Sequence, residues 1–192
     1  KYSSNGNFES SFKLENKGTR STFIQPFKNA LYTNLYTFDE SGKRFLLSKV
    51  DVTNGKRISF QFEASQYNKG WNELFSTNQH TFISGPTGNT KFMQIFMDTI
   101  FEITPKGIKP YITLQSKKLV TKEYLETLIA ENDMSKSTRV SKICDRLMKT
   151  DKIYNVFDYW ETGKYIHFSY HIGFYVYSIL YKKEENLSLI HI

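Results

Sequence analysis

The chain has 192 residues, of which 16% are aromatic, and this length can form one domain with a substantial hydrophobic core. Its single cysteine, Cys144, excludes an internal disulfide bond and a cysteine-rich metal site. No apolar run approaches the roughly 20 residues of a membrane-spanning helix, so we expect no membrane span. The formal net charge is +7, but the lysines are scattered and lie mostly beside predicted turns, which favours a solvated surface over a nucleic-acid-binding face.

Short alternating segments joined by turn residues recur along the chain and predict an all-β protein. Asn5-Gly6 predicts the first turn, because this pair tolerates the positive φ angles that tight hairpins need. Further turns are predicted at residues 39–42, 53–55, 85–88 and 161–163. The segments between the turns are rich in aromatic and β-branched residues and indicate about ten to twelve strands.

The stretch FEITPKGIKPYITLQ predicts one of these hairpins in more detail. Residues 99–104 and 108–115 alternate in the manner of strands. Pro105 and Gly107 mark the turn between them, since proline presets φ and glycine supplies a positive φ. Pro110 has no N–H to donate to a neighbouring strand, so we expect its strand at an edge of the sheet.

The hairpins repeat at a regular spacing. Gly6, Gly55 and Gly107 each lie in a polar turn that leads into an alternating strand, and they lie about fifty residues apart. A period of this length in antiparallel strands is typical of β-propellers, in which the shared hairpin forms the outer two strands of a blade. The fold class that we predict is all-β, a partial β-propeller of about three to four blades, each a four-stranded antiparallel meander.

The segment at about residues 121–150 has helical periodicity instead. TKEYLETLIAEND and SKSTRVSKICDRLMK each place apolar residues on one face, and Thr121 is a suitable N-cap. We expect two short helices inserted between blades, with Cys144 as a buried structural thiol on the apolar stripe. Trp71, earlier in the chain, is expected to fill a hydrophobic gap.

Two motifs flank the helical segment. FMDTIFEITPKGIKPYITLQSKKL carries an Asp-Thr-Ile-aromatic strand at 98–101, and KIYNVFDYWETGKYIHFSY carries an ETGKY turn at 161–165 and an F-S-Y strand at 168–170. In this order they resemble the six-bladed β-propeller proteins exported by Gram-negative gut bacteria. The resemblance covers residues 81–183 well and residues 1–62 loosely.

The resemblance implies a longer protein that closes a ring of six blades and carries an N-terminal lipoprotein signal. We therefore expect residues 1–186 to be an incomplete six-bladed propeller, and the chain to be a truncated fragment. The segment LSLIHI, residues 187–192, reads like the translation of a transposon-derived sequencing adapter, so we expect a non-native tail. The alternative is an ordinary apolar closing strand.

The candidate ligand-binding residues lie in the aromatic stretch VFDYWETGKYIHFSYHIGFYVY. We select Tyr159, Trp160, His167 and His171, because they lie near a turn or on the more polar face, and exposed aromatic rings stack on sugars or anchor peptides. The alternative is that the aromatic rings fill the gap between blades. His167 and His171 have the spacing of metal ligands on a helix, but on a strand they lie about 13 Å apart, so we expect no metal. We also expect no catalytic residue and no cofactor.

These observations favour a non-catalytic exported binding or scaffold protein of the cell envelope, associated through the resemblance with glycan or nutrient uptake. Its partner would be a glycan, a peptide or a cell-envelope protein, with a lipid anchor in the full-length protein and no nucleic acid. The alternative is a propeller enzyme, a lyase or hydrolase acting on a glycan or peptide. A basic nucleic-acid-binding protein is the third hypothesis, and it predicts a steep salt dependence of DNA affinity.

Overall fold

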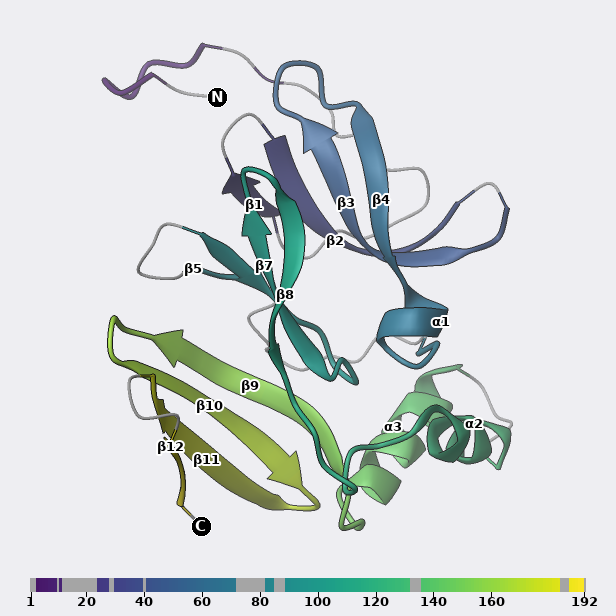
Figure 1. Cartoon of the computed structure of the whole chain (residues 1–192). Coiled ribbons are helices and arrows are strands. Elements are labelled where there is room, and N and C mark those ends of the chain that lie inside the picture. The colour runs from purple at the N-terminus through teal and green to yellow at the C-terminus, as the bar shows by residue number, and fades with distance from the viewer. Residues whose placement is uncertain are drawn as a thin grey trace. The chain divides into compact units, whose positions relative to one another are not determined.

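The computed structural model describes most of the chain (Figure 1). The described residues are 3–9, 11, 24–27, 30–39, 41–71, 82–84, 89–131, 136–183 and 187–191. They divide into two compact units, Lys1–Glu63 and Ala64–Ile192.

The first unit holds one antiparallel sheet whose strands follow chain order. This first sheet consists of β1 (Ile24–Phe27), β2 (Ala30–Phe38), β3 (Arg44–Asp51) and β4 (Arg57–Glu63). Gly42 and Gly55, in the two predicted turns, have φ angles of +80° and +73°, a conformation that favours glycine. Leu46, Leu47 and Val50 of β3 are buried, as are Ala30 and Tyr32 of β2.

The second unit holds two more antiparallel sheets of four strands, again in chain order. The second sheet consists of β5 (Phe82–Ser84), β6 (Thr90–Phe92), β7 (Thr99–Thr104) and β8 (Gly107–Thr113). The third sheet consists of β9 (Ile153–Glu161), β10 (Tyr165–Ile172), β11 (Tyr175–Lys182) and β12 (Leu187–His191). A single turn of helix, α1 (Ala64–Tyr67), precedes the second sheet.

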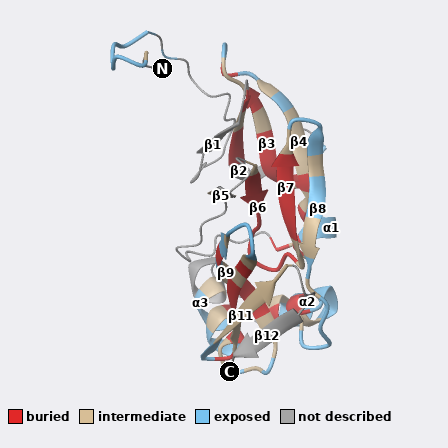
Figure 2. Cartoon of the chain, turned by 60° about the vertical axis from the view of Figure 1, so that its left-hand side comes forward, coloured by how far each residue is buried: buried red, intermediate tan, exposed pale blue. Residues whose placement is uncertain are grey.

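The hairpin of β7 and β8 confirms the prediction made for residues 99–115. Residues 100–103 of β7 are all buried, which means that both faces of this strand are covered, whereas β8 is half-buried or exposed along its length (Figure 2). Pro110 lies opposite Phe101, and β8 is the edge of the second sheet. The edge position explains why a residue without an N–H is tolerated there.

The predicted helical insertion consists of α2 (Lys122–Ala130) and α3 (Lys136–Leu147). Thr121 caps α2 as expected, because its side chain accepts a hydrogen bond of 3.2 Å from the backbone N–H of Tyr124. The helices build a compact apolar core with Trp71, whose side chain is fully buried and meets Phe96 edge-on at 5.2 Å between ring centroids. The core consists of Trp71, Ile95, Phe96, Val120, Leu125, Leu128, Ile143, Leu147 and Tyr154.

Cys144 of α3 is half-buried rather than fully buried. Burial, with the nearby charge of Asp145, raises the pKa of its thiol to about 11. The group is therefore a neutral thiol at neutral pH, which agrees with a structural rather than a reactive cysteine.

Three successive four-stranded meanders, with two helices between the second and the third, give the chain an all-β, partial propeller-like fold, as the sequence predicts. Gly55 and Gly107 both lie at the turn that joins the last two strands of a sheet, so the repeated hairpin is the same part of each meander. Gly6 also lies in a turn, in which its N–H donates to the Ser3 carbonyl at 3.0 Å. The turn predicted at 85–88 lies outside the described residues.

Leu187–His191 form the strand β12, which pairs with β11. That residues 187–192 are a non-native tail, and that residues 1–186 are part of a six-bladed ring, both stay predictions. In the part of the chain that the structure describes, no helix is long and apolar enough to cross a membrane.

Gly173, in the turn between β10 and β11, has a φ of +58°, and a Cβ there would lie only 2.8 Å from the Thr150 carbonyl oxygen. We expect Gly173→Ala to lower the free energy of unfolding by about 3 kcal/mol or more, because left-handed strain adds to this clash with backbone. Chemical denaturation measures the change.

Gly70→Ala is the matched control in the same unit. Gly70 has a φ of +75°, and an added Cβ would have nothing within 4 Å. The alanine would therefore be strained without a clash, and we expect the free energy of unfolding to fall by only about 1 kcal/mol. Equal losses in the two variants would contradict the close contact at Gly173.

Candidate functional site

A buried ionic cluster lies between the second and third sheets. Lys91 of β6 and Glu102 of β7 form an ion pair and a hydrogen bond, with side chains only 2% and 7% exposed. Lys109 of β8 approaches the same carboxylate at 3.1 Å from the more exposed side. The Lys91 ammonium also lies 3.6 Å from the centroid of the Tyr111 ring, a cation–π contact.

Glu161, at the end of β9, joins the third sheet to this cluster. Its carboxylate is 5% exposed and lies 2.5 Å from the Lys183 ammonium and 3.8 Å from that of Lys91. The Tyr111 hydroxyl donates to one oxygen, and the Tyr159 hydroxyl donates to the other at 2.7 Å. The Lys183 ammonium also donates to the Thr162 carbonyl at 2.7 Å. Burying a charge is costly unless it is paired and hydrogen-bonded, and Glu161 meets both conditions.

The cluster holds both carboxylates in their charged form. Burial alone would raise the pKa of Glu161, but the hydrogen bonds from its lysine and tyrosine partners, with the charge of Lys91, lower it below the ordinary value. In the same way, hydrogen bonds and charges of two lysines outweigh burial and lower the pKa of Glu102. Burial, and the hydrogen bond to Glu161, raise the pKa of the Tyr159 hydroxyl, which keeps it a donor.

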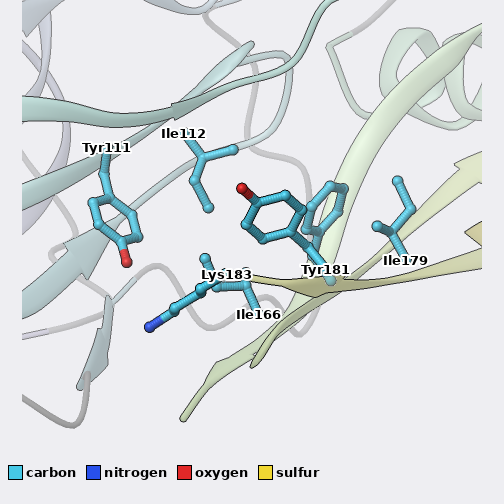
Figure 3. Close-up of a pocket in the computed structure, with 7 residues that line it drawn as sticks. Tyr111, Ile112, Ile166, Ile179, Tyr181 and Lys183 are labelled. Carbon is cyan, nitrogen blue, oxygen red and sulfur yellow. The ribbon is translucent and has the colours of Figure 1, made fainter. Parts of the chain in front are cut away.

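A pocket of about 490 Å³ opens beside the cluster (Figure 3). One wall comes from β8, and the other comes from β10, β11 and the residue that follows β11. It is lined by Tyr111, Ile112, Ile166, Phe168, Ile179, Tyr181 and Lys183. In Figure 3 the polar ends of Tyr111 and Lys183 lie at the same side of the pocket, which is the side of Glu161, and the remaining lining is mainly apolar.

A second feature, on β9 and β10, is a stacked pair of rings formed by Trp160 and His167. The indole and imidazole rings are 5.0 Å apart and 14° from parallel, and Trp160 is 43% exposed. The Nδ1 of His167 lies 3.0 Å from the Asp158 carbonyl oxygen. Because a carbonyl can only accept, Nδ1 carries the proton, and this bond fixes the imidazole under the indole.

A β-bulge lies next to this arrangement. Asp158 has a φ of +52°, and the pairing of β9 with β10 shifts register between His167 and Ser169. Aspartate tolerates the left-handed region better than most residues. Strand alternation exposes Trp160 while Tyr159, its neighbour, is buried, and Trp160 lies directly opposite His167 in the register.

The four residues selected from the sequence therefore do not form one site. Trp160 and His167 contact each other, whereas Tyr159 belongs to the buried ionic cluster. His171 is half-buried and stacks on Phe157 at 4.6 Å, and burial lowers the pKa of its imidazole. His171 thus resembles a packed ring, which is the alternative interpretation of the aromatic stretch.

The sequence analysis missed the cluster residues Lys91, Glu102 and Lys183. A usable signal was present, since Lys91 and Glu102 interrupt strands that are otherwise apolar or β-branched, and a charge in a strand covered on both faces needs a partner. Among the described residues, no group of three or more His, Cys, Asp and Glu side chains is placed to hold a metal ion.

Comparison with known proteins gives one structural match. No family model matches the chain, and no curated protein matches it. Among solved structures, a protein of Bacteroides fragilis NCTC 9343 that bears the name "putative exported protein" is similar, with a TM-score of 0.66 and 14% sequence identity. The match covers 91% of this chain and 46% of that one, so the chain spans about half the length of the Bacteroides protein. At this identity the likeness shows the fold alone.

The ionic cluster predicts a specific loss of stability in acid. A carboxyl group whose pKa is lower in the folded state stabilises the fold above its unfolded pKa, which is ordinarily 4.5, and this contribution is lost as the pH falls through the folded pKa. We expect Glu161→Gln to lower the free energy of unfolding by about 3 kcal/mol at neutral pH, because Lys183 and Lys91 lose a charged partner. The further loss on acidification should be smaller than in the unmodified chain.

Urea unfolding at neutral pH and at about pH 3.5 measures both effects. Glu126→Gln, at an exposed position of α2, removes a carboxylate of the same type outside the cluster and should change neither quantity by more than about 0.5 kcal/mol. A Glu161→Gln variant that matches the unmodified chain at both pH values would show that the cluster contributes no stability.

Proposed function

We propose that this chain is part of an exported, non-catalytic β-propeller of six blades that binds a glycan in the cell envelope. The blade number is supported by two facts together. The described residues form three four-stranded meanders, and the chain spans 46% of the Bacteroides protein. Export is supported by the name of that protein and by the motifs at 98–101 and 161–170. A lipid anchor on the full-length protein belongs to the same proposal.

The exposed stack of Trp160 on His167 is the observation that carries the binding proposal. One face of the indole lies against the imidazole, and Trp160 as a whole remains 43% exposed. A pyranose ring has a face of C–H groups that packs on such a surface, while its hydroxyl groups need polar partners. The Asp158 carboxylate, with a side chain 64% exposed, lies next to the stack and can accept hydrogen bonds from hydroxyl groups.

The state of the buried carboxylates favours binding over catalysis. A glycosidase of the usual type needs one protonated carboxyl group that donates to the leaving oxygen and a second carboxylate on the other side of the bond. Glu102 and Glu161 have lowered pKa values and are each held by lysines, so they suit a structural role. These two groups are therefore poor candidates for a general acid at neutral pH.

A glycan array followed by calorimetry on the best ligand tests the proposal. We expect Trp160→Ala to weaken binding about tenfold or more, because the stacking surface is removed, and Trp160→Phe to keep part of the affinity. Unchanged affinity in Trp160→Ala would place the ligand elsewhere. Turnover of a glycan or peptide, with no stable binding, would contradict the non-catalytic function itself.

Phe174→Ala is the matched control for an exposed aromatic residue. Phe174 is 66% exposed in the turn between β10 and β11, away from the register positions of Trp160 and His167. Its replacement should leave glycan affinity unchanged. An equal loss in Trp160→Ala and Phe174→Ala would mean that general surface apolarity, rather than the stacked pair, holds the ligand.

A further inference from the structure

The pocket between β8 and the β10–β11 hairpin differs in chemistry from the Trp160 surface. Ile112, Ile166, Phe168 and Ile179 supply aliphatic and aromatic walls. The polar ends of Tyr111 and Lys183 lie at one side, and the hydroxyl of Tyr181 lies apart from them (Figure 3). The volume of about 490 Å³ falls within the range of small-molecule sites. A sugar would lose the hydrogen bonds of most of its hydroxyl groups in such a lining, so the glycan proposed above does not suit this pocket.

We propose that this pocket binds an aliphatic carboxylate, with the alkyl chain against the isoleucine and phenylalanine side chains and the carboxylate at Lys183. The apolar walls match the chain because burial of each CH₂ group is favourable by the hydrophobic effect. One end of the pocket is cationic, and this end selects the charge of the head group.

Counted over the described residues, the ionic cluster beside the pocket has one positive charge in excess. Its lysines are Lys91, Lys109 and Lys183, and its carboxylates are Glu102 and Glu161. The cluster therefore attracts an anion although two carboxylates belong to it. Since both carboxylates are held ionised by their partners, this excess persists at neutral pH.

Lys183 is the member of the cluster that reaches the pocket. Its ammonium group has three N–H donors, and the structure assigns two of them, to Glu161 at 2.5 Å and to the Thr162 carbonyl at 2.7 Å. With a side chain 26% exposed, it is the most accessible of the lysines that contact Glu161. A carboxylate in the pocket takes the third donor without displacing either existing bond.

The test compares ligands that differ only in the head group. Decanoate, decanol and decylamine have the same alkyl chain and are measured by isothermal calorimetry with the full chain, below their aggregation concentrations. We expect decanoate to bind at least tenfold more tightly than decanol and decylamine to bind most weakly, because the cluster repels a second cation. Equal affinities for decanoate and decanol, or no binding of decanoate, would overturn the proposal.

Two variants locate the ligand. Lys183→Met keeps the aliphatic stem and removes the charge, so the affinity for decanoate should fall to that for decanol. Lys164→Met is the control, at an exposed lysine whose backbone carbonyl accepts a hydrogen bond from the backbone N–H of Lys183. It should leave the affinity for decanoate unchanged. Because Lys183→Met also removes a partner of buried Glu161, Ile179→Trp serves as a second variant that fills the pocket and should abolish binding of both ligands. Decanoate binding that survives Ile179→Trp would place the site elsewhere.

The glycan site and this pocket are separable in the same experiments. Trp160→Ala should leave decanoate affinity unchanged, and Ile179→Trp should leave glycan affinity unchanged. Loss of decanoate binding in Trp160→Ala would contradict a carboxylate site between β8 and the β10–β11 hairpin, whatever the glycan array shows.

Discussion

The second unit depends on the requirement that buried charges be paired. Glu161 comes from the third sheet, Lys91 and Glu102 come from the second sheet, and all three side chains are almost fully removed from water. None of them can stay charged in that environment without the others, because the desolvation cost of each is offset only by its partners. The pairing of these charges therefore ties the second sheet to the third. The same contacts position the pocket walls, since Tyr111 and Lys183 belong to both the cluster and the pocket.

Strand β9 has a different role on each side. Tyr159 and Glu161 point into the ionic cluster, while Trp160 between them is exposed and stacks on His167. Strand alternation places Trp160 on the opposite side from its two neighbours, and the bulge at Asp158 adds the carbonyl that orients the imidazole. A strand without the bulge would still alternate, but it would lack the carbonyl that fixes His167. The bulge thus fixes one of the two rings of the surface on which the glycan proposal rests.

The sequence predicted features that depend on backbone chemistry and on local periodicity. Pro110 implied an edge strand because proline has no N–H, Thr121 implied a helix start because its hydroxyl can accept, and the spacing of Gly55 and Gly107 implied repeated meanders. The ionic cluster could not be predicted in the same way. Tyr111 and Glu161 are 50 residues apart, and no local pattern specifies which distant charge a buried carboxylate meets. Tyr159 was selected with Trp160 as a ligand residue for its position near a turn, but strand alternation places the two on opposite sides.

The apolar helical core and the buried ionic cluster of the second unit differ in how well they tolerate amino-acid substitutions. The helical core around Trp71 is apolar, and such cores accept substitutions that conserve volume. The ionic cluster does not, because loss of one partner leaves a charge buried. A fold shared at 14% identity with the Bacteroides protein shows that the meander itself makes few demands on sequence. The cluster makes stricter demands, and the pocket is built against it. A well-packed apolar contact would hold the two sheets together at no desolvation cost. Burial of the charged groups Lys91, Glu102 and Glu161 carries such a cost. We therefore expect these groups to have a second role, which is to set the charge of the pocket beside them.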